Sequence, residues 1–496
     1  MNRFRFPLIA AFLSALVLTT QAEVEEEYWA RLFFGGQPVG HLHSRTEKLS
    51  LAGEPVYKVT QSMAMTFSRA GTTLDVSYES KILEAADGTI RNFSTSMRVG
   101  PQSLLSQGSV RDGVIHLKNE QGSHEIPYPA GAVGSRAFDR ALRAPGLTVG
   151  ATGQMLTFDA DNPAEAIQVS WKVLPPESKE ALGTIYQTVP ITLSYSRFPG
   201  MNVKIWTDTD ARFIAGQIPL GGLGLLEMVR APREVALGHV QPAEVFTTSL
   251  ITPDQPIPHA AQLTRATFRL KTPPEITLSL PNGVGQTILK QEPGLIELRV
   301  EMPTEPDPAL VWNLPLPPSE TLAPMLAANR YLDWQDPNVQ TLAKEIRGAE
   351  TNALAIARRI QDEVYRRIGH KNLATGFARA SDVARTLSGD CTEHAVLAAA
   401  IARASGLPAR VVSGLVHAPD PSRKSAQGVF GFHMWAEVMV APDTWWPIDP
   451  AFNRFDPTHI AFTRSSLDGM NPEVDLAIPI LDAIGRIQLE VIAEHP

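Results

Sequence analysis

The pattern of hydrophobic and polar positions changes character along the chain. From about Glu25 to Val235, short runs rich in β-branched and aromatic residues alternate with glycine-containing turns. Such spacing is typical of antiparallel strands joined by hairpins. We therefore expect an antiparallel β-rich domain over residues 23–235. Its clearest predicted strands are Tyr28 to Phe34, Tyr57 to Phe67, Thr73 to Leu83 and Ser94 to Val99.

Two proline clusters divide the chain beyond this region. They lie between Pro242 and Pro258 and between Pro303 and Pro318, and they predict boundaries or loops. We expect residues 236–315 to form a second β module or an extension of the first domain, with a Pro-rich linker, and residues 316–496 to form a separate domain. Three runs between the clusters are predicted strands: Thr264 to Leu270, Glu275 to Leu280 and Gly294 to Met302.

Helical periodicity appears only after the second proline cluster. Residues 337–348 and 350–368 carry apolar residues three and four positions apart, which predicts two helices. Residues 395–404 form an apolar run that ends at Gly406 and Pro408, where a third helix is expected to stop. Strand patterns follow these helices, so we predict the α+β class for the C-terminal domain.

Composition and charge narrow the class of protein. The chain has 496 residues, a net charge of -8 and 44% hydrophobic residues, which is a globular composition. No basic run stands out, which argues against nucleic acid as a partner. Arg3 and Arg5 precede the apolar stretch Pro7 to Leu18, and Ala22 is a small residue at which cleavage is expected. A bilayer-spanning helix needs about 20 apolar residues, so residues 1–22 are predicted to be a signal peptide rather than an anchor, although a buried N-terminal helix is the alternative.

No later stretch is long and apolar enough for a membrane helix, so no integral membrane segment is expected after signal cleavage. We predict a periplasmic or secreted bacterial protein of unknown oligomeric state.

Cys391 is the only cysteine of the chain, so it cannot form an internal disulfide. Asp390 before it is a good helix cap, and Glu393 follows three residues later, as in a capping box. Cys391 is therefore predicted in the first turn of a helix. There the unpaired N–H groups and the positive end of the helix dipole favour a thiolate, which is the form of cysteine that acts as a nucleophile.

A base and a carboxylate follow in the order that a thiol nucleophile requires. Alternation along residues 433–440 places His433, Trp435 and Glu437 on one face of a strand. A short turn then leads to a second strand that ends at Asp449, so hairpin pairing is expected to bring Asp449 back to His433. A thiol needs a base to take its proton, and the base needs a carboxylate to hold its tautomer.

These blocks resemble the bacterial transglutaminase-like superfamily. The resemblance covers roughly residues 330 to 465 and implies a papain-like α+β core with Cys391 as nucleophile, His433 as base and Asp449 as orienting acid. It does not extend to the first 300 or so residues. The segments that carry it are Gly389 to Ala395, Gly406 to Val411, His433 to Val438, Pro447 to Pro450 and Asp456 to Ile460.

The resemblance implies an enzyme that cleaves or transfers amide bonds through a thioester on cysteine. The resemblance leaves the acyl acceptor open. Water as the acceptor makes the protein a peptidase or amidase, and an amine makes it an acyltransferase. We expect a protein or peptide substrate and neither a cofactor nor a metal. Trp435, Glu437 and Trp446 are predicted to line the substrate cleft. The alternative is a catalytically silent envelope binding or scaffold protein that uses its β-rich region.

Two other histidine sites are weaker hypotheses. His394, one helical turn after Cys391, is a rival base, but it is expected to point alongside the thiol rather than across a cleft. His41 and His43 share one strand face and form a metal pair only if a third ligand joins them, and none is evident.

Overall fold

A computed structural model of the chain describes most of its residues. The predicted signal peptide lies outside them except for Ala22. None of the helices in the described parts of the chain is long and apolar enough to cross a membrane. The described residues are 22–69, 71–100, 102–119, 122–144, 146–220, 223–276, 278–369, 377–420, 425–469, 476 and 483–495.

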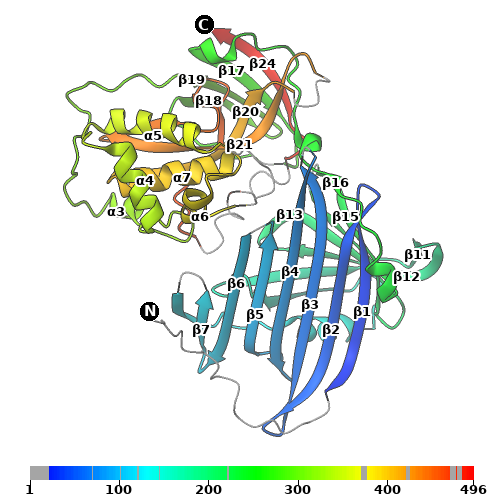
Figure 1. The fold of residues 1–496 in the computed structure, drawn as a ribbon. Helices are drawn as coiled ribbons and strands as arrows, with labels where there is room; N and C mark the ends of the chain where they lie inside the picture. The colour runs from blue at the N-terminus through cyan, green and yellow to red at the C-terminus, as the bar shows by residue number, and fades with distance from the viewer. Residues whose placement is uncertain are drawn as a thin grey trace.

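The N-terminal domain is one large sheet that folds over on itself, with the blue and cyan strands in front and the teal strands behind (Figure 1). Its main path runs β8-β7-β6-β5-β4-β3-β2-β1-β15-β14-β13-β12-β10-β9, and neighbouring strands on this path are antiparallel. The first eight strands are β1 (Glu23–Phe34), β2 (Gln37–Leu51), β3 (Glu54–Arg69), β4 (Thr72–Ala85), β5 (Ile90–Val99), β6 (Gln102–Arg111), β7 (Val114–Asn119) and β8 (Gly122–Pro127).

The second half of this domain returns along the other edge of β1. Helix α1 (Ser135–Arg143) packs its Phe138 and Leu142 against Trp171 of the rear strands, and α2 (Arg233–Ala236) follows the last long strand. Short β11 pairs with β12, and short β16 pairs in parallel with β3. The strands are β9 (Thr152–Phe158), β10 (Ala166–Val173), β11 (Glu177–Ala181), β12 (Thr184–Tyr195), β13 (Phe198–Thr207), β14 (Phe213–Pro219), β15 (Leu225–Ala231) and β16 (Ala243–Glu244).

A second, four-stranded sheet has the order β18-β19-β17-β24 and lies at the top of Figure 1. Its last strand comes from the C-terminus of the chain and pairs antiparallel with β17. This sheet therefore draws strands from both predicted units, residues 236–315 and residues 316–496. The boundary between these units stays a prediction. Its strands are β17 (Arg265–Lys271), β18 (Gln286–Glu292), β19 (Leu295–Glu301) and β24 (Gln488–His495).

The C-terminal domain packs helices against a third sheet of order β22-β21-β20-β23. Its central helix α7 packs against β20 and β21, with α4, α5 and α6 around it (Figure 1). The helices are α3 (Ala323–Leu326), α4 (Pro337–Arg347), α5 (Ala353–Arg367), α6 (Ala380–Thr386) and α7 (Cys391–Ala404). The strands are β20 (Ala409–Ala418), β21 (Val429–Ala441), β22 (Thr444–Ile448) and β23 (Ile460–Ser465).

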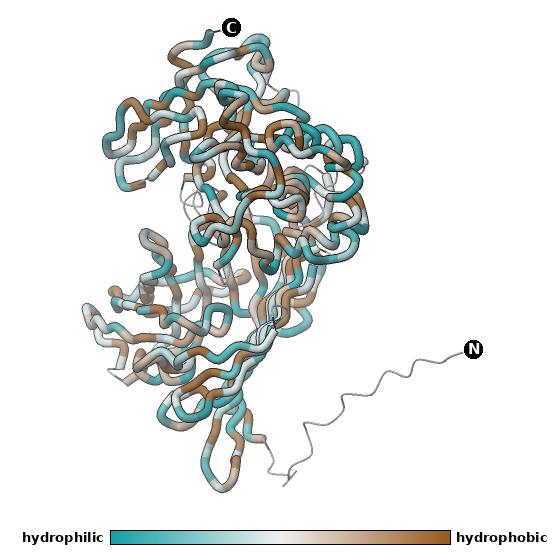
Figure 2. Tube along the Cα trace, turned by 90° about the vertical axis from the view of Figure 1, so that its left-hand side faces the viewer, coloured by the Kyte–Doolittle hydropathy of each residue, from teal (hydrophilic) through white to brown (hydrophobic). Residues whose placement is uncertain are grey.

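The main hydrophobic core lies between α7 and one face of this sheet. Residues 395–402 of α7 are almost completely buried because helices and strands surround them on all sides. A second core joins the opposite face of the sheet to the β17–β19–β24 sheet, through Phe430, Ile460 and Phe268 among others. Figure 2 shows hydrophobic segments inside the upper body, while brown and teal alternate along the strands of the lower one. The burial of both faces explains why β21 is apolar at nearly every position.

Most predicted elements are confirmed, including both early helices, the helix after Cys391 and the β21–β22 hairpin. One predicted strand is wrong: the described residues within Glu275 to Leu280 form no strand. Prolines flank this run at Pro273, Pro274 and Pro281, and proline cannot donate a hydrogen bond to a sheet ladder. The sheet uses β18 instead, which the sequence pattern did not indicate.

Candidate active site

Helix α7 begins at Cys391, as the sequence predicts. Asp390 caps it, with the backbone N–H of Thr392 donating to Oδ1 at 2.9 Å. The Glu393 carboxylate closes the capping box by accepting from the Asp390 N–H at 2.8 Å. Gly389 has a φ of 151°, and a Cβ at this position would lie 2.4 Å from Cβ of Glu393. Glycine is thus required here for the tight turn that leads into the helix.

The Cys391 thiol lies beside the strand that carries His433. Its side chain is partly buried, and it is hydrogen-bonded by the backbone of Met434. Burial raises the pKa of the thiol, and the neighbouring carboxylate of Asp390 raises it further, while the Met434 hydrogen bond lowers it. These effects oppose the thiolate that the start of a helix favours. The reason is physical: desolvation disfavours the anion, and an acidic residue already occupies the positive end of the helix.

The β21–β22 hairpin brings His433 and Asp449 together. Nε2 of His433 lies 2.8 Å from Oδ2 of Asp449, and both side chains are almost completely buried. A carboxylate accepts hydrogen bonds, so this contact places the imidazole proton on Nε2. The lone pair of Nδ1 is then left to accept a proton from another group.

Asp449 is held on every side. Its Oδ1 accepts the backbone N–H groups of Ala451 at 2.8 Å and Phe452 at 3.4 Å, and its own N–H donates to Oε1 of Gln361 in α5 at 3.0 Å. Burial favours a neutral carboxyl, but His433 and the second imidazole described next outweigh this effect and hold the pKa of Asp449 well below its usual range. The carboxylate is therefore an anion in a fixed orientation.

A second imidazole, His459, contacts the same carboxylate oxygen. Its Nε2 lies 3.0 Å from Oδ2 of Asp449, and its Nδ1 lies 3.4 Å from Oδ1 of Asp456. Burial disfavours the charged ring, but the bonds to these two aspartates outweigh it and raise the pKa of His459 to about 9. Sequence reasoning gave this residue no role, although it stands in the Asp456 to Ile460 segment of the resemblance.

His433, Asp449 and His459 also form a cluster whose ligand-type atoms lie within 4.8 Å of one another. Both Nε2 atoms already lie at hydrogen-bond distance from one carboxylate oxygen. The cluster therefore fits a hydrogen-bonded network of two imidazoles and a carboxylate better than a metal centre.

The predicted substrate-binding residues differ in exposure. Trp435 and Glu437 are each 1% exposed, and Trp446 is partly exposed. Glu437 lies between two arginines, 2.6 Å from Arg410 and 3.0 Å from Arg464. The role of these three residues in substrate binding stays a prediction.

The two weaker histidine sites have other contacts. Nδ1 of His394 lies 2.6 Å from the carbonyl oxygen of Asp390, within the first turn of α7. His43 lies 2.8 Å from Glu27 and stacks on Trp29 with ring centroids 4.0 Å apart. The roles of His394 and His43 stay predictions.

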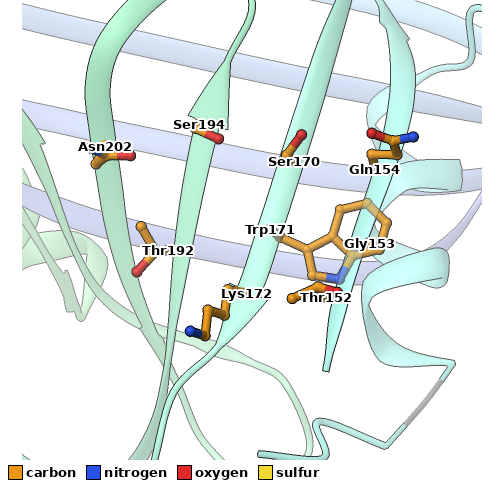
Figure 3. Close-up of a pocket in the computed structure, with 9 residues that line it drawn as sticks. All are labelled: Thr152, Gly153, Gln154, Ser170, Trp171, Lys172, Thr192, Ser194 and Asn202. Atoms are coloured by element: carbon orange, nitrogen blue, oxygen red, sulfur yellow. The ribbon is translucent and has the colours of Figure 1, made fainter. Parts of the chain in front are cut away.

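A separate hollow lies on the β-rich domain, with a volume of about 520 Å³. Hydroxyl and amide side chains from four neighbouring strands line it, together with Lys172 (Figure 3). The ring of Trp171 lies against Gly153, where a Cβ would come within 2.1 Å of it. The hollow has no residue in common with the thiol site. Its other lining residues are Thr152, Gln154, Ser170, Thr192, Ser194 and Asn202.

Cys391 at the start of α7 and the His433–Asp449 pair on the β21–β22 hairpin belong to one α+β domain. In a comparison with known families, residues 340–450 match the model of the transglutaminase-like superfamily core. This part of the chain is therefore a transglutaminase-like domain, which confirms the resemblance predicted from the sequence. No curated protein matches the chain.

Solved structures show distant likenesses. A β-barrel-like protein of Brucella abortus is 13% identical, with a TM-score of 0.31, over 41% of this chain and 94% of that one. A candidate cysteine protease of Cytophaga hutchinsonii is 16% identical, with a TM-score of 0.28, over 47% and 84%. The periplasmic domain of TgpA from Pseudomonas aeruginosa, bound to ethylmercury, is 18% identical, with a TM-score of 0.25, over 47% and 80%. At these values none of them bears on what this chain does.

Proposed function

We propose that this protein is a thiol enzyme that acts on amide bonds, with Cys391 as nucleophile, His433 as general base and Asp449 as the residue that orients the base. One observation carries the proposal. Nε2 of His433 lies 2.8 Å from Oδ2 of Asp449, and helix α7, which begins at Cys391, packs against β21, the strand that carries His433. The base and the nucleophile thus meet at one strand, with the carboxylate behind the base.

The first half of the reaction forms a thioester. As the sulfur of Cys391 attacks the amide carbonyl carbon, the thiol proton passes to Nδ1 of His433, and Asp449 stabilises the imidazolium that results. The tetrahedral intermediate then collapses. Its C–N bond breaks, the leaving nitrogen takes the proton from Nδ1, and the acyl group stays on sulfur.

The second half releases the acyl group. An acceptor attacks the thioester carbonyl carbon and gives its proton to Nδ1 of His433. The C–S bond breaks, and sulfur takes that proton back, which restores the resting thiol. With water as the acceptor the product is a carboxylic acid, and with an amine it is a new amide. Water is the default acceptor in an aqueous compartment, so we favour hydrolysis of protein or peptide substrates.

The raised pKa of Cys391 decides how the base acts. A thiol that is neutral at rest must lose its proton during the attack, so His433 acts in the transition state rather than as a preformed ion pair. Such a thiol is also protected from oxidation, which suits an exported enzyme. We propose the periplasm or the medium as its location, and residues 1–22 as the export signal.

An acyl-transfer assay tests the proposal. The full chain is mixed with p-nitrophenyl acetate, and the early burst of p-nitrophenol is compared with the amount of protein, while intact mass spectrometry of an acid-quenched sample looks for one acetyl group. We expect a stoichiometric burst and an acetyl adduct on Cys391, both absent in Cys391→Ala. In His433→Ala the burst is expected to slow by roughly two to four orders of magnitude, since that is the usual contribution of a general base.

The exposed His239, on a loop of the β-rich region, provides the matched control. His239→Ala is expected to react like the wild type. Amide turnover is then followed with casein and with benzyloxycarbonyl-Gln-Gly, with and without hydroxylamine, which separates hydrolysis from amine transfer. Equal p-nitrophenol release by the wild type and Cys391→Ala would contradict the proposal and favour a silent binding protein.

A further inference from the structure

The β-rich domain reaches the thiol site through the tip of its β3–β4 hairpin. Arg69, the last residue of β3, donates from Nη2 to Oδ2 of Asp390 at 3.1 Å. Asp390 is the residue before the nucleophile and the cap of its helix. The contact therefore joins two parts of the chain that are 321 residues apart, directly beside Cys391.

The hairpin tip is fixed in place by the segment that leaves the β-rich domain. Strand β16 pairs in parallel with the end of β3, with Ala243 opposite Phe67 and Glu244 opposite Ser68. The Ser68 hydroxyl donates to Glu244 at 2.9 Å, and the Val245 N–H donates to the Ser68 carbonyl at 3.0 Å. These bonds lie next to Arg69, so its backbone is part of a paired strand rather than a free loop end.

The same segment continues to the strand that carries the catalytic histidine. Ile251 and Phe430 exchange two backbone hydrogen bonds, of 2.8 and 2.7 Å, in an antiparallel bridge. Phe430 lies in β21, three residues before His433. Residues 243–251 thus connect the hairpin tip to β21, and Figure 1 shows β16 at this junction. The position of Arg69 is therefore set relative to both Cys391 and His433.

The charge of Arg69 at this position affects the protonation of the Cys391 thiol. The charged groups that act on the thiol are Asp390, Glu393 and Arg69, and the imidazoles of His394 and His433 belong to α7 and β21, the two elements that pack together there. Burial raises the pKa of Glu393 to about 8, and the neighbouring Asp390 raises it further. The negative charge of Asp390 opposes a thiolate, whereas the positive charge of Arg69 favours one.

We propose that Arg69 is a positioning residue of the thiol site: the β-rich domain supplies the cation that neutralises Asp390 and thereby sets how readily Cys391 loses its proton. The two domains then form one composite active site, and the β-rich region is more than an attached binding module. This inference rests on the proposed thiol chemistry. It adds a requirement for a residue that lies outside the transglutaminase-like domain.

A role in docking alone makes a different prediction. If the pair with Asp390 only held the domains together, Arg69→Met would change stability and leave the protonation of the thiol as it was. The pH dependence of alkylation separates the two roles, because the alkylation rate follows the fraction of thiolate. Cys391 is the sole cysteine, so label uptake reports this site alone.

The experiment measures the rate of iodoacetamide incorporation from pH 6 to 10.5 in the full-length wild type, Arg69→Met, Arg69→Lys and Asp390→Asn. Thermal melts confirm that each variant is folded. Arg98, an exposed arginine on β5 of the same sheet, gives the control Arg98→Met. Asparagine is as good a helix cap as aspartate, so Asp390→Asn removes the charge and keeps the cap.

We expect Arg69→Met to react roughly three- to tenfold more slowly than the wild type at any pH below the midpoint, because one nearby charge shifts a pKa by up to about one unit at a partly screened site. Arg69→Lys is expected to keep most of the rate, and Arg98→Met all of it. Asp390→Asn is expected to react faster, and Arg69→Met is expected to have a smaller effect in that background.

An unchanged rate profile in folded Arg69→Met overturns the inference. An unchanged profile in Asp390→Asn overturns it as well, and this second variant serves as the test if Arg69→Met fails to fold. A wild type without the acetyl burst on Cys391 contradicts the proposed function instead, so the two failures are distinguishable.

Discussion

Nε2 of His459 lies 3.0 Å from Oδ2 of Asp449, the same carboxylate oxygen that His433 contacts at 2.8 Å. Two buried imidazoles therefore compete for one acceptor. His459 also contacts Asp456, so the positive charge of its ring is balanced by two carboxylates, those of Asp449 and Asp456. We interpret it as the group that anchors Asp449 as an anion behind His433.

The protonation of His459 predicts a pH dependence of stability. Its folded pKa of about 9 lies above the ordinary histidine value of 6.5, so the stabilisation is complete below pH 6.5 and is lost as the pH rises through 9. We expect the free energy of unfolding to fall by about 2–3 kcal/mol across this interval. His459→Gln should flatten this part of the profile. Urea unfolding at pH 6, 7.5 and 9, followed by tryptophan fluorescence, measures it.

The exposed His239 gives the control for this measurement, and His239→Gln is expected to keep the wild-type profile. Equal pH profiles for His459→Gln and the wild type would show that His459 is neutral in the folded protein. The cluster with His433 and Asp449 would then have to be reconsidered as a metal centre.

Asp449→Asn tests the orienting carboxylate. An amide in this place no longer stabilises the imidazolium and allows the wrong tautomer, so we expect the acyl-transfer rate to fall by about three to four orders of magnitude, as in other triads of this kind. Asp443 lies exposed in the β21–β22 turn with a φ of 52°, a conformation that asparagine adopts readily. Asp443→Asn is the matched control and should be fully active. A loss below tenfold in Asp449→Asn would remove Asp449 from the mechanism.

The parts of the site that could be predicted from the sequence are those encoded locally. The capping box of Asp390 and Glu393 specifies where α7 begins, and alternation in β21 specifies which residues share a face with His433. The short turn before β22 brings Asp449 back within hydrogen-bond distance. Each of these follows from a period or a turn within about 20 residues, so no tertiary information is needed.

The remainder depends on contacts between distant segments. The pairing of β24 with β17 and the contact of Arg69 with Asp390 have no local signature, because each depends on how whole sheets are placed. The effect of burial on the Cys391 pKa could not be predicted from the sequence for a related reason. The helix dipole is readable from the sequence, whereas the desolvation that outweighs it arises only from packing.

The raised pKa of Cys391 predicts slow alkylation at neutral pH. Burial and the Asp390 charge disfavour the thiolate, so the midpoint of the rate against pH should lie above the free-thiol value of about 8.5. The same thiol in urea-unfolded protein is the internal control and should titrate near 8.5. A folded-state midpoint below 7 would instead indicate a resting ion pair with His433.

Gln286 of β18 joins the second sheet to the third, because its side-chain amide pairs with Ala461 as a strand backbone would. Its side chain is 3% exposed, accepts the Ala461 N–H at 2.8 Å and donates to the Ala461 carbonyl at 2.9 Å. Gln286→Leu leaves both backbone groups of Ala461 buried without partners, so we expect a loss of about 2–3 kcal/mol in stability. Gln291 lies exposed on the same strand, and Gln291→Leu should cost well under half of that. Urea unfolding of the two variants makes the comparison. Equal losses would mean that the apolar core around Phe268 and Phe430, rather than this amide, holds the two sheets together.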